Sequence, residues 1–268
     1  MCGEGSLSVI VPVIDSRAVI DPKARIAEGV SIGPYSVIGP DVEIGEGTWI
    51  GPHVVINGPC RIGKENKFYQ FSSIGEDPQD KKYNGEPTLL EIGDRNVIRE
   101  YCTFNRGTVQ DKGTTKIGND NWIMAYVHIA HDCEVGNSTI LANNATLAGH
   151  VIIEDHVILG GASLIHQFCV VGAHSFVGMG SAIAKDVPPF MMVAGQPAEP
   201  HGLNLEGLRR RGFTPEAIKA LRKSYKIIYR SGLTVVQALE QLKPLMDEFE
   251  PVVQLAEFVR NSGRGIVR

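Results

Sequence analysis

Two histidines three residues apart, His128 and His131, stand in the stretch HIAHDCEVGN, and Asp132 follows the second. A carboxylate beside an imidazole fixes its tautomer and stabilises the imidazolium, which suits a histidine that moves a proton. Histidines with acidic neighbours also bind zinc. Polar residues on an exposed turn would look the same. Deciding between these interpretations requires the positions of the side chains, and these depend on the elements that carry them.

Aliphatic residues recur at every sixth position along most of the chain. The series runs from Ile14 to Ile74, from Ile92 to Phe104 and from Ile117 to Ile183, and 24 of its 26 residues are Ile, Leu or Val. This period fits neither an α-helix nor a single strand. It fits a solenoid in which each hexad forms a short strand and a corner, so that three hexads close one coil. The pattern predicts a mostly β fold and resembles the left-handed parallel β-helix of hexapeptide-repeat proteins, whose hand the spacing alone does not give.

The repeat is interrupted twice and then ends. Residues 75–91 and 109–115 are polar segments that leave it, and such loops commonly carry function. We predict an N-terminal extension over 1–12, a β-helix over 13–190 and a C-terminal α-helical domain over 191–268.

Helix-start signals follow the repeat. Thr214 with Pro215, and Thr234 with Gln237 in a capping box, predict the starts of two helices, and Pro251 begins a shorter third.

Composition narrows the function. The net charge of −4 argues against general nucleic-acid binding, and no apolar run approaches the roughly 20 residues of a membrane-spanning helix. The N-terminus lacks the features of a signal peptide, so we expect a cytoplasmic protein. Four of the five cysteines occupy the fifth position of a hexad, where small residues recur, so we interpret them as core residues rather than nucleophiles.

The coil geometry brings the histidines together. Because residues 18 apart lie above one another, His131 stacks on Gly149 and Gln167. In the neighbouring columns Asp132 stacks on His150, and Ala148 stacks on His166. His128 lies on the same face. This convergence favours a functional site, but it leaves open whether His131, His150 and His166 bind zinc or serve proton transfer.

Six motifs in order resemble the UDP-N-acetylglucosamine acyltransferase family: IGEDPQDKKYNGEPT, IREYCTFNRGTV, HIAHDC, LANNATLAGHV, HQFCVVGAHSFVGMGSAIAKDVPP and NLEGLRRRGF. The resemblance covers about residues 13–268. It implies transfer of an (R)-3-hydroxyacyl group from acyl carrier protein to the 3-hydroxyl of UDP-N-acetylglucosamine, the first step of lipid A biosynthesis. It implies a homotrimer with sites between subunits, and no metal and no cofactor other than the acyl-phosphopantetheine of the carrier protein.

The resemblance also implies residue roles. His131 matches the general base, Asp132 its orienting partner and the backbone N–H of Gly149 the oxyanion donor. Met179 matches a position that limits acyl length, which predicts a chain nearer ten carbons than fourteen. Asn105 stands where many members have histidine. The positions that match substrate-binding or site-stabilising residues are Gln79, Asp80, Lys82, His128, His150, His166, Gln167, Asn204, Glu206, Arg210 and Arg211.

Charge is also unevenly distributed. Residues 201–231 contain eight Lys or Arg against two Glu, which suits docking of an acidic carrier protein. Other classes stay open at this stage: an N-acyltransferase of the same pathway, a coenzyme A-dependent acetyltransferase, a zinc hydratase and a purely structural solenoid.

Overall fold

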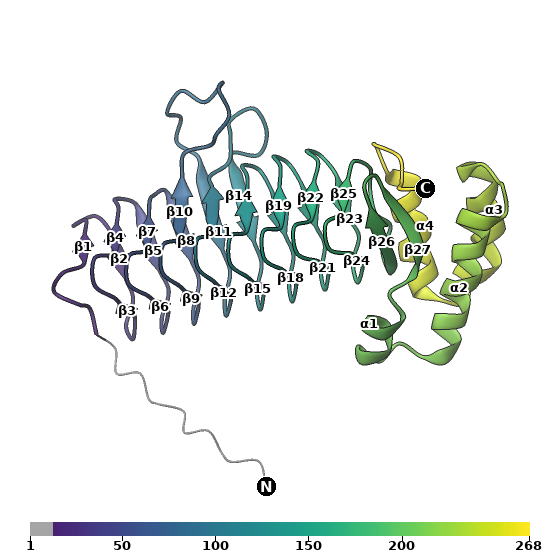
Figure 1. Cartoon of the computed structure of the whole chain (residues 1–268), viewed down its shortest axis with the longest axis horizontal. Helices are drawn as coiled ribbons and strands as arrows, with labels where there is room; N and C mark the ends of the chain where they lie inside the picture. Colours follow the sequence, from purple (N-terminus) through teal and green to yellow (C-terminus); the bar gives the residue numbers. More distant parts are fainter. Residues whose placement is uncertain (1–12) are drawn as a thin grey trace, which may run out of the picture.

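A computed structural model describes residues 13–268, and the expected extension over 1–12 lies outside these residues. The chain from β1 to β25 winds as a left-handed parallel β-helix, and Figure 1 shows its coils following one another along the long axis. Successive strands belong in turn to three sheets, which we call A, B and C. Their meeting edges are the A–B, B–C and C–A corners.

Each sheet is a ladder of short strands, most of them two residues long. Within residues 13–268, sheet B has nine strands and sheet C eight. Sheet B comprises β1 (Val19–Ile20), β4 (Val37–Ile38), β7 (Val55–Ile56), β10 (Ser73–Glu76), β13 (Thr103–Asn105), β16 (His128–Ile129), β19 (Thr146–Leu147), β22 (Leu164–Ile165) and β25 (Ala182–Ile183). Sheet C comprises β2 (Arg25–Ile26), β5 (Val42–Ile44), β8 (Cys60–Ile62), β11 (Leu89–Ile92), β14 (Thr114–Ile117), β17 (Glu134–Val135), β20 (Ile152–Ile153) and β23 (Val170–Val171).

Sheet A differs at its end. In the described part of the chain it has ten strands, because an antiparallel pair extends it past the last coil. It comprises β3 (Ser31–Ile32), β6 (Trp49–Ile50), β9 (Lys67–Phe68), β12 (Val97–Ile98), β15 (Trp122–Ile123), β18 (Ile140–Leu141), β21 (Ile158–Leu159), β24 (Phe176–Val177), β26 (Met191–Gly195) and β27 (Ala198–Leu203). Residues 191–203 therefore form a β-hairpin, whereas we predicted a purely helical domain from residue 191. The run MMVAG supplies strand-forming residues that the hexad pattern does not mark.

The predicted inward positions form the core. From Ile32 to Ile183 every residue of the six-residue series is buried, whereas Ile14, in the first coil, is 49% exposed. Cys60, Cys102, Cys133 and Cys169 are fully buried beside them, and burial raises the pKa of the Cys133 thiol to about 12. These four are core residues, as predicted; Cys2 lies outside the described residues.

Two excursions interrupt the coils at one corner. The first comprises residues 77–88 between β10 and β11, and the second comprises residues 106–113 between β13 and β14. The predicted range 75–91 also included the adjoining ends of β10 and β11. The predicted range 109–115 omitted residues 106–108 and included the start of β14. Partners 30 apart, such as Ile62 and Ile92, flank the first excursion, and partners 25 apart, such as Ile92 and Ile117, flank the second. Both excursions leave from the B–C corner, and Figure 1 shows them rising from the same edge.

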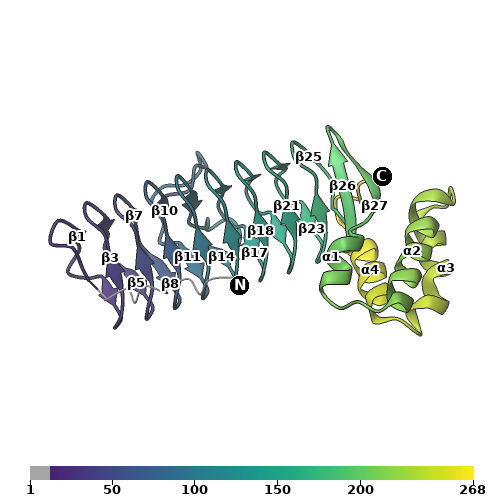
Figure 2. The same cartoon turned by 60° about the horizontal axis from the view of Figure 1, so that its bottom comes forward.

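Four helices follow the hairpin at the end of the β-helix (Figure 2). They are α1 (Leu205–Arg210), α2 (Pro215–Arg230), α3 (Val235–Met246) and α4 (Glu250–Asn261). The predicted N-cap at Thr214 and the capping box of Thr234 and Gln237 are both formed. The short α1 was not predicted, and α4 is as long as α3. No helix in the described part of the chain has the length and apolar character to cross a membrane.

Candidate active site

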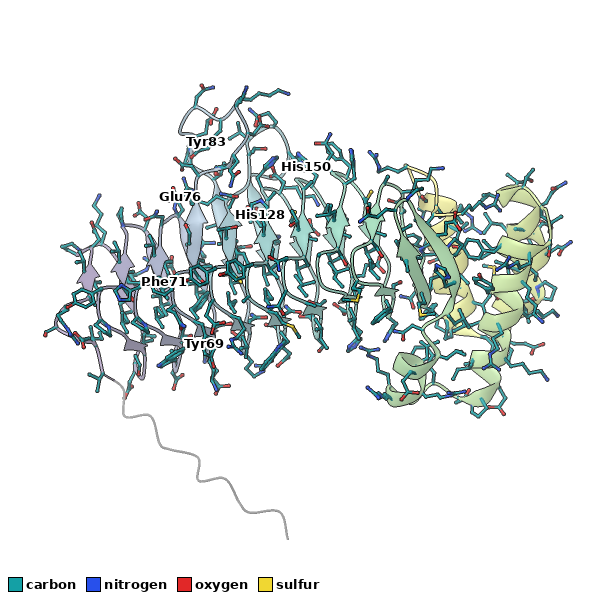
Figure 3. All side chains as sticks on the ribbon, viewed as in Figure 1. Tyr69, Phe71, Glu76, Tyr83, His128 and His150 are labelled. Atoms are coloured by element: carbon teal, nitrogen blue, oxygen red, sulfur yellow. The ribbon has the colours of Figure 1, made fainter. Side chains whose placement is uncertain are left out.

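The B–C corner carries the residues of the HIAHDC motif. His128 lies on β16, and the chain turns at His131 and Asp132 before β17 begins. Register pairs residues 18 apart across β16, β19 and β22, and the N–H of His150 donates to the carbonyl of His131. The predicted stack of His131 on Gly149 is therefore confirmed, and Figure 3 shows His128 and His150 on the side from which the excursions rise.

His131 is held by a buried carboxylate. Its Nδ1 lies 2.9 Å from Oδ2 of Asp132, whose side chain is fully buried. The backbone N–H of Thr108 donates to both carboxylate oxygens at 2.9 and 3.1 Å, and its hydroxyl donates at 2.7 Å. Burial opposes the charge of Asp132, but the hydrogen bonds from His131 and Thr108 outweigh it and hold the pKa of this carboxyl below its ordinary value. A charged Asp132 fixes the Nδ1–H tautomer, which leaves Nε2 of His131 free to accept a proton.

Gly149 lies against this free nitrogen. A Cβ atom at Gly149 would be 2.7 Å from Nε2 and 2.6 Å from Cε1 of His131. Within residues 13–268, no protein acceptor takes the N–H of Gly149. The backbone thus places a hydrogen-bond donor beside a proton acceptor, which is the arrangement needed for a carbonyl attacked by a hydroxyl group.

His150 forms a second imidazole–carboxylate pair. Its Nδ1 lies 2.7 Å from Oδ2 of Asp111, in the second excursion. The ring stacks on Phe168 with centroids 4.4 Å apart and meets the ring of His131 edge-on at 5.0 Å. The sequence did not reveal Asp111 or Thr108 as site residues, because an excursion has no register from which to place them.

His128 and His166 lie at the margin of this group. Nδ1 of His128 is 2.7 Å from the hydroxyl of Thr103, and burial lowers the pKa of His128. Nδ1 of His166 faces the carbonyl of Gln167 at 3.1 Å and the guanidinium of Arg264 at 3.4 Å. His166 and Gln167 are both exposed.

The residues that could bind a metal ion differ from the set His131, His150 and His166 that the sequence suggested. Among the described residues, the ligand atoms of His131, Asp132 and His150 lie within 4.8 Å of one another. His166 is not part of this group, so a three-histidine zinc site is not formed within one chain. The short hydrogen bonds to Asp132 engage the same oxygens that a cation would need.

The first excursion is fastened at its base. Arg106 is buried and contacts the carbonyl of Gly75, the carboxylate of Asp77 and, at 3.1 Å, the hydroxyl of Tyr83. Asn105, which replaces the expected histidine, is also buried and donates from Nδ2 to the carbonyl of Asp77 at 2.7 Å. Within residues 13–268, its Oδ1 has no hydrogen-bond partner. Asn105 therefore ties the end of β13 to the first excursion.

The predicted substrate contacts of this excursion lie beyond the junction. Gln79 and Lys82 are exposed, and Oδ1 of Asp80 accepts from the N–H of Lys82 at 3.0 Å.

The predicted residues after 200 lie at a different corner. Asn204 is buried at the N-cap of α1, accepts from the N–H of Gly207 and donates to the carbonyl of His174 at 2.9 Å. Arg211 donates to the carbonyl of His156 at 3.2 Å. Both histidines turn the C–A corner, on the opposite edge from the excursions (Figure 1). Exposed Glu206 and Arg210 pair with each other on α1 at 3.0 Å. One chain therefore does not join these residues to His131.

Met179 lies at the third corner. It turns the A–B corner between β24 and β25 with 81% of its surface exposed. The predicted site residues are thus divided among all three corners of one chain.

Comparison with known proteins defines the class. Residues 41–76 and 114–149 match the bacterial transferase hexapeptide model, and residues 186–267 match the model described as UDP N-acetylglucosamine O-acyltransferase, domain 2. The fold and these matches define a hexapeptide-repeat transferase with an acyltransferase C-terminal domain.

Full-length relatives define the family. The acyl-[acyl-carrier-protein]–UDP-N-acetylglucosamine O-acyltransferase of Thiobacillus denitrificans is 60% identical over 95% of this chain and 99% of its own length. The solved UDP-N-acetylglucosamine acyltransferase of Francisella novicida superposes with a TM-score of 0.93 at 44% identity, covering 96% of this chain and 94% of that one. The O-acyltransferase of Moraxella catarrhalis also gives 0.93, at 50% identity over 95% and 99%. The chain belongs to the acyl-[acyl-carrier-protein]–UDP-N-acetylglucosamine O-acyltransferase family and is an O-acyltransferase.

Proposed function

We propose that this enzyme transfers an (R)-3-hydroxyacyl group from acyl carrier protein to the 3-hydroxyl of UDP-N-acetylglucosamine, as the first step of lipid A biosynthesis. The substrates named for its relatives support this assignment. The enzyme needs no cofactor of its own, since the acyl-phosphopantetheine arrives on the carrier protein. The observation that carries the proposal is the His131–Asp132 pair lying against Gly149, whose N–H is bound by no acceptor within residues 13–268.

The chemistry follows from that arrangement. Nε2 of His131 takes the proton of the sugar hydroxyl as its oxygen attacks the thioester carbonyl. The resulting oxyanion accepts a hydrogen bond from the N–H of Gly149. Collapse of this tetrahedral intermediate breaks the carbon–sulfur bond and expels the thiolate of the phosphopantetheine arm. The thiolate then takes from His131 the proton that came from the sugar hydroxyl. The acyl group passes directly to the sugar, so no acyl-enzyme forms.

The test is a mass-spectrometric assay with UDP-N-acetylglucosamine and 3-hydroxyacyl carrier proteins. His131→Ala should lower kcat/KM by about 10²–10⁴-fold, as expected for loss of a positioned base. The control is Lys116→Ala, which changes an exposed residue of sheet C, the sheet that the proposed trimer leaves on the outside. Product formation by His131→Ala at the wild-type rate would falsify the assignment of the base.

The surfaces of the β-helix support a homotrimer. Outward residues of sheet C alternate in charge from Arg25 through Glu43 and Arg61 to Glu91, and neighbours form salt bridges. Most of the large exposed apolar residues of the described chain lie on sheets A and B and at their shared corner instead: Val19, Val37, Leu164, Trp122, Tyr35, Phe71, Tyr101, Tyr126 and Met179. Apolar surface of this extent marks a protein–protein interface.

The trimer would complete the site. With the A–B corners at a three-fold axis, sheet B of one subunit packs on sheet A of the next. The B–C corner of one subunit then lies beside the C–A corner of its neighbour. His131 of one subunit would thus share a groove with Arg210 and Arg211 of the next, and a planar guanidinium suits the diphosphate of the sugar nucleotide.

Mixing inactive subunits tests this sharing. Trimers reassembled from His131→Ala and Arg210→Ala chains should regain activity, because some sites receive both intact halves. Chains that carry both substitutions should regain none when mixed with themselves. Absence of recovery in trimers proven to contain both chains would place the two residues in one subunit's site.

Met179 supports a short acyl chain. A thioether at an exposed corner would fill the end of a groove formed with a neighbour. Met179→Gly should move the preferred donor from about ten carbons toward fourteen. Val236→Ala, which alters an exposed apolar residue of α3, is the control, and an unchanged preference in Met179→Gly contradicts the length assignment.

Carrier docking is assigned to the basic surface of the C-terminal helices. Arg209, Arg222 and Lys223 are exposed on α1 and α2. Because surface charge acts mainly on association and is screened by salt, KM for the carrier protein should rise steeply with ionic strength. A KM that is indifferent to salt contradicts this docking mode.

A further inference from the structure

The second excursion brings a carboxylate to His150 from 39 residues away. Nδ1 of His150 lies 2.7 Å from Oδ2 of Asp111, and the side chains are 16% and 36% exposed. Asp132, the other carboxylate near this ring, is 4.0 Å from the same nitrogen. Asp111 is thus the main partner of His150.

The other sides of the imidazole of His150 are occupied. Phe168 stacks on one face with an interplanar angle of 12°, and His131 meets the ring at 90°. A ring held in this way has few orientations, so the hydrogen bond at Nδ1 decides which nitrogen carries a proton and which faces substrate.

The excursion that carries Asp111 is itself anchored to the catalytic pair. Thr108 donates twice to Asp132, and the N–H of Asp111 donates to the carbonyl of Thr108 at 3.3 Å. At the outer side Lys112 pairs with Glu134 on sheet C. Asp111 is therefore positioned by the same segment that holds the carboxylate of the proposed base.

We infer that Asp111 is a positioning residue of the acyl-transfer site: it fixes the Nδ1–H form of His150 and so directs Nε2 toward a substrate oxygen. This inference rests on the proposed function. The site then contains two imidazole–carboxylate pairs in contact, His131 with Asp132 for proton transfer and His150 with Asp111 for holding the substrate. In this form Nε2 of His150 carries no proton and accepts a hydrogen bond from a hydroxyl group of the substrate.

A double-mutant cycle tests whether Asp111 acts through His150. Asp111→Ala should lower kcat/KM about tenfold or more, as expected for loss of a charge-assisted hydrogen bond. Asp111→Glu, which keeps the carboxylate, should recover most of this loss. In the His150→Ala background, Asp111→Ala should have no further effect. Equal losses in the two backgrounds overturn the inference.

Lys112→Ala is the matched control. It alters the neighbouring residue of the same excursion and removes a salt bridge, but it leaves the contact with His150 intact. Its kcat/KM should stay at the wild-type level. A loss as large as that of Asp111→Ala would show a general effect of the excursion and overturn the role of the carboxylate.

A spectroscopic measurement separates this inference from the proposed function. Nitrogen NMR of histidine-labelled enzyme should show His150 protonated at Nδ1 in the wild type and shifted toward Nε2–H in Asp111→Ala, while His131 keeps its form. No substrate is needed, so the result stands whichever acyl acceptor the enzyme uses. An unchanged His150 tautomer in Asp111→Ala overturns the inference even if the proposed reaction is confirmed.

Discussion

The B–C and A–B corners use the same backbone for different purposes. At both, the fourth residue of a hexad has a left-handed conformation, with φ of 59° at Asp132 and 58° at Tyr101. On the A–B corner these residues form a ladder of stacked rings, and Tyr101 and Tyr126 lie 4.8 Å apart. On the B–C corner the same positions hold Asp132, His150 and Phe168, and both excursions leave there.

This difference shows what turns a repetitive corner into a site. The coils alone supply columns of side chains at fixed spacing, as on the A–B corner. On the B–C corner the second excursion adds partners from outside the columns, with Thr108 on Asp132 and Asp111 on His150. The excursions therefore convert stacked polar residues into pairs of defined tautomer.

The largest effect that tests this contrast is expected from Asp132→Asn. An amide can donate to Nδ1 of His131 and so favour the wrong tautomer, which should lower kcat/KM by about 10³–10⁴-fold. Because the A–B corner lies at the proposed three-fold axis, the reverse exchange at the equivalent position, Asn144→Asp, is assayed on enzyme shown to be trimeric, where it should leave activity unchanged. Similar losses in both variants would mean that the two corners do not differ in this way.

The same substitution has a signature in stability. Because the pKa of Asp132 in the folded protein lies below its ordinary value of 3.8, its charge stabilises the fold above that pH, and this contribution is lost as pH falls through the folded-state pKa. Asp132→Asn should unfold at a lower denaturant concentration than the wild type at pH 7. The difference in this denaturant concentration between Asp132→Asn and the wild type should become smaller below about pH 4.

The next largest effect is expected from one methyl group. A Cβ at Gly149 would lie 2.6 Å from His131, whereas a Cβ at Gly161 on the A–B corner would meet its nearest atom, the carbonyl oxygen of Asn143, at 3.4 Å. Gly149→Ala should displace the imidazole and lower kcat/KM about 10²-fold, and Gly161→Ala should have little effect. Thermal unfolding of both variants distinguishes a moved side chain from a damaged fold.

The sequence predicted the columns and the presence of both excursions, but not the contacts that the excursions make, for a physical reason. A strict period of six fixes which residues face inward and which lie 18 apart, so the stack of His131 on Gly149 followed from counting. The contacts of Thr108 and Asp111 depend on the path of an irregular segment, which has no period. The hairpin of β26 and β27 was missed because it continues sheet A after the hexads have ended.

The division of the site among corners could not be predicted from spacing either. Asn204 and Arg211 follow the repeat, so no coil register applies to them. Their corner is set by hydrogen bonds to the carbonyls of His174 and His156.

The smallest effect concerns the C–A corner, where the same hexad position holds a histidine that forms no ion pair with a carboxylate in the described part of the chain. His174 stacks between His156 and Phe190, and its buried Nδ1 has no hydrogen-bond partner among the residues that the structure describes. Burial, together with the positive charges of His156 and Arg211, lowers the pKa of His174 from 6.5 to about 4. The folded protein thus keeps this ring neutral where the unfolded chain would protonate it.

The sign follows from linkage. As pH falls from 6.5 to about 4, the unfolded state gains a proton that folded His174 does not, so the fold loses stability over that window. His174→Phe keeps the stack and removes the titration, so its free energy of unfolding should fall less between pH 7 and pH 4.5. The free energy of unfolding of His174→Phe should fall less than that of the wild type by on the order of 1 kcal/mol, because the partial exposure of His174 screens the effect. The control is His53→Phe, which changes one ring of the stacked ladder on the A–B corner. If the free energy of unfolding has the same pH dependence in the wild type and in His174→Phe, the prediction is contradicted.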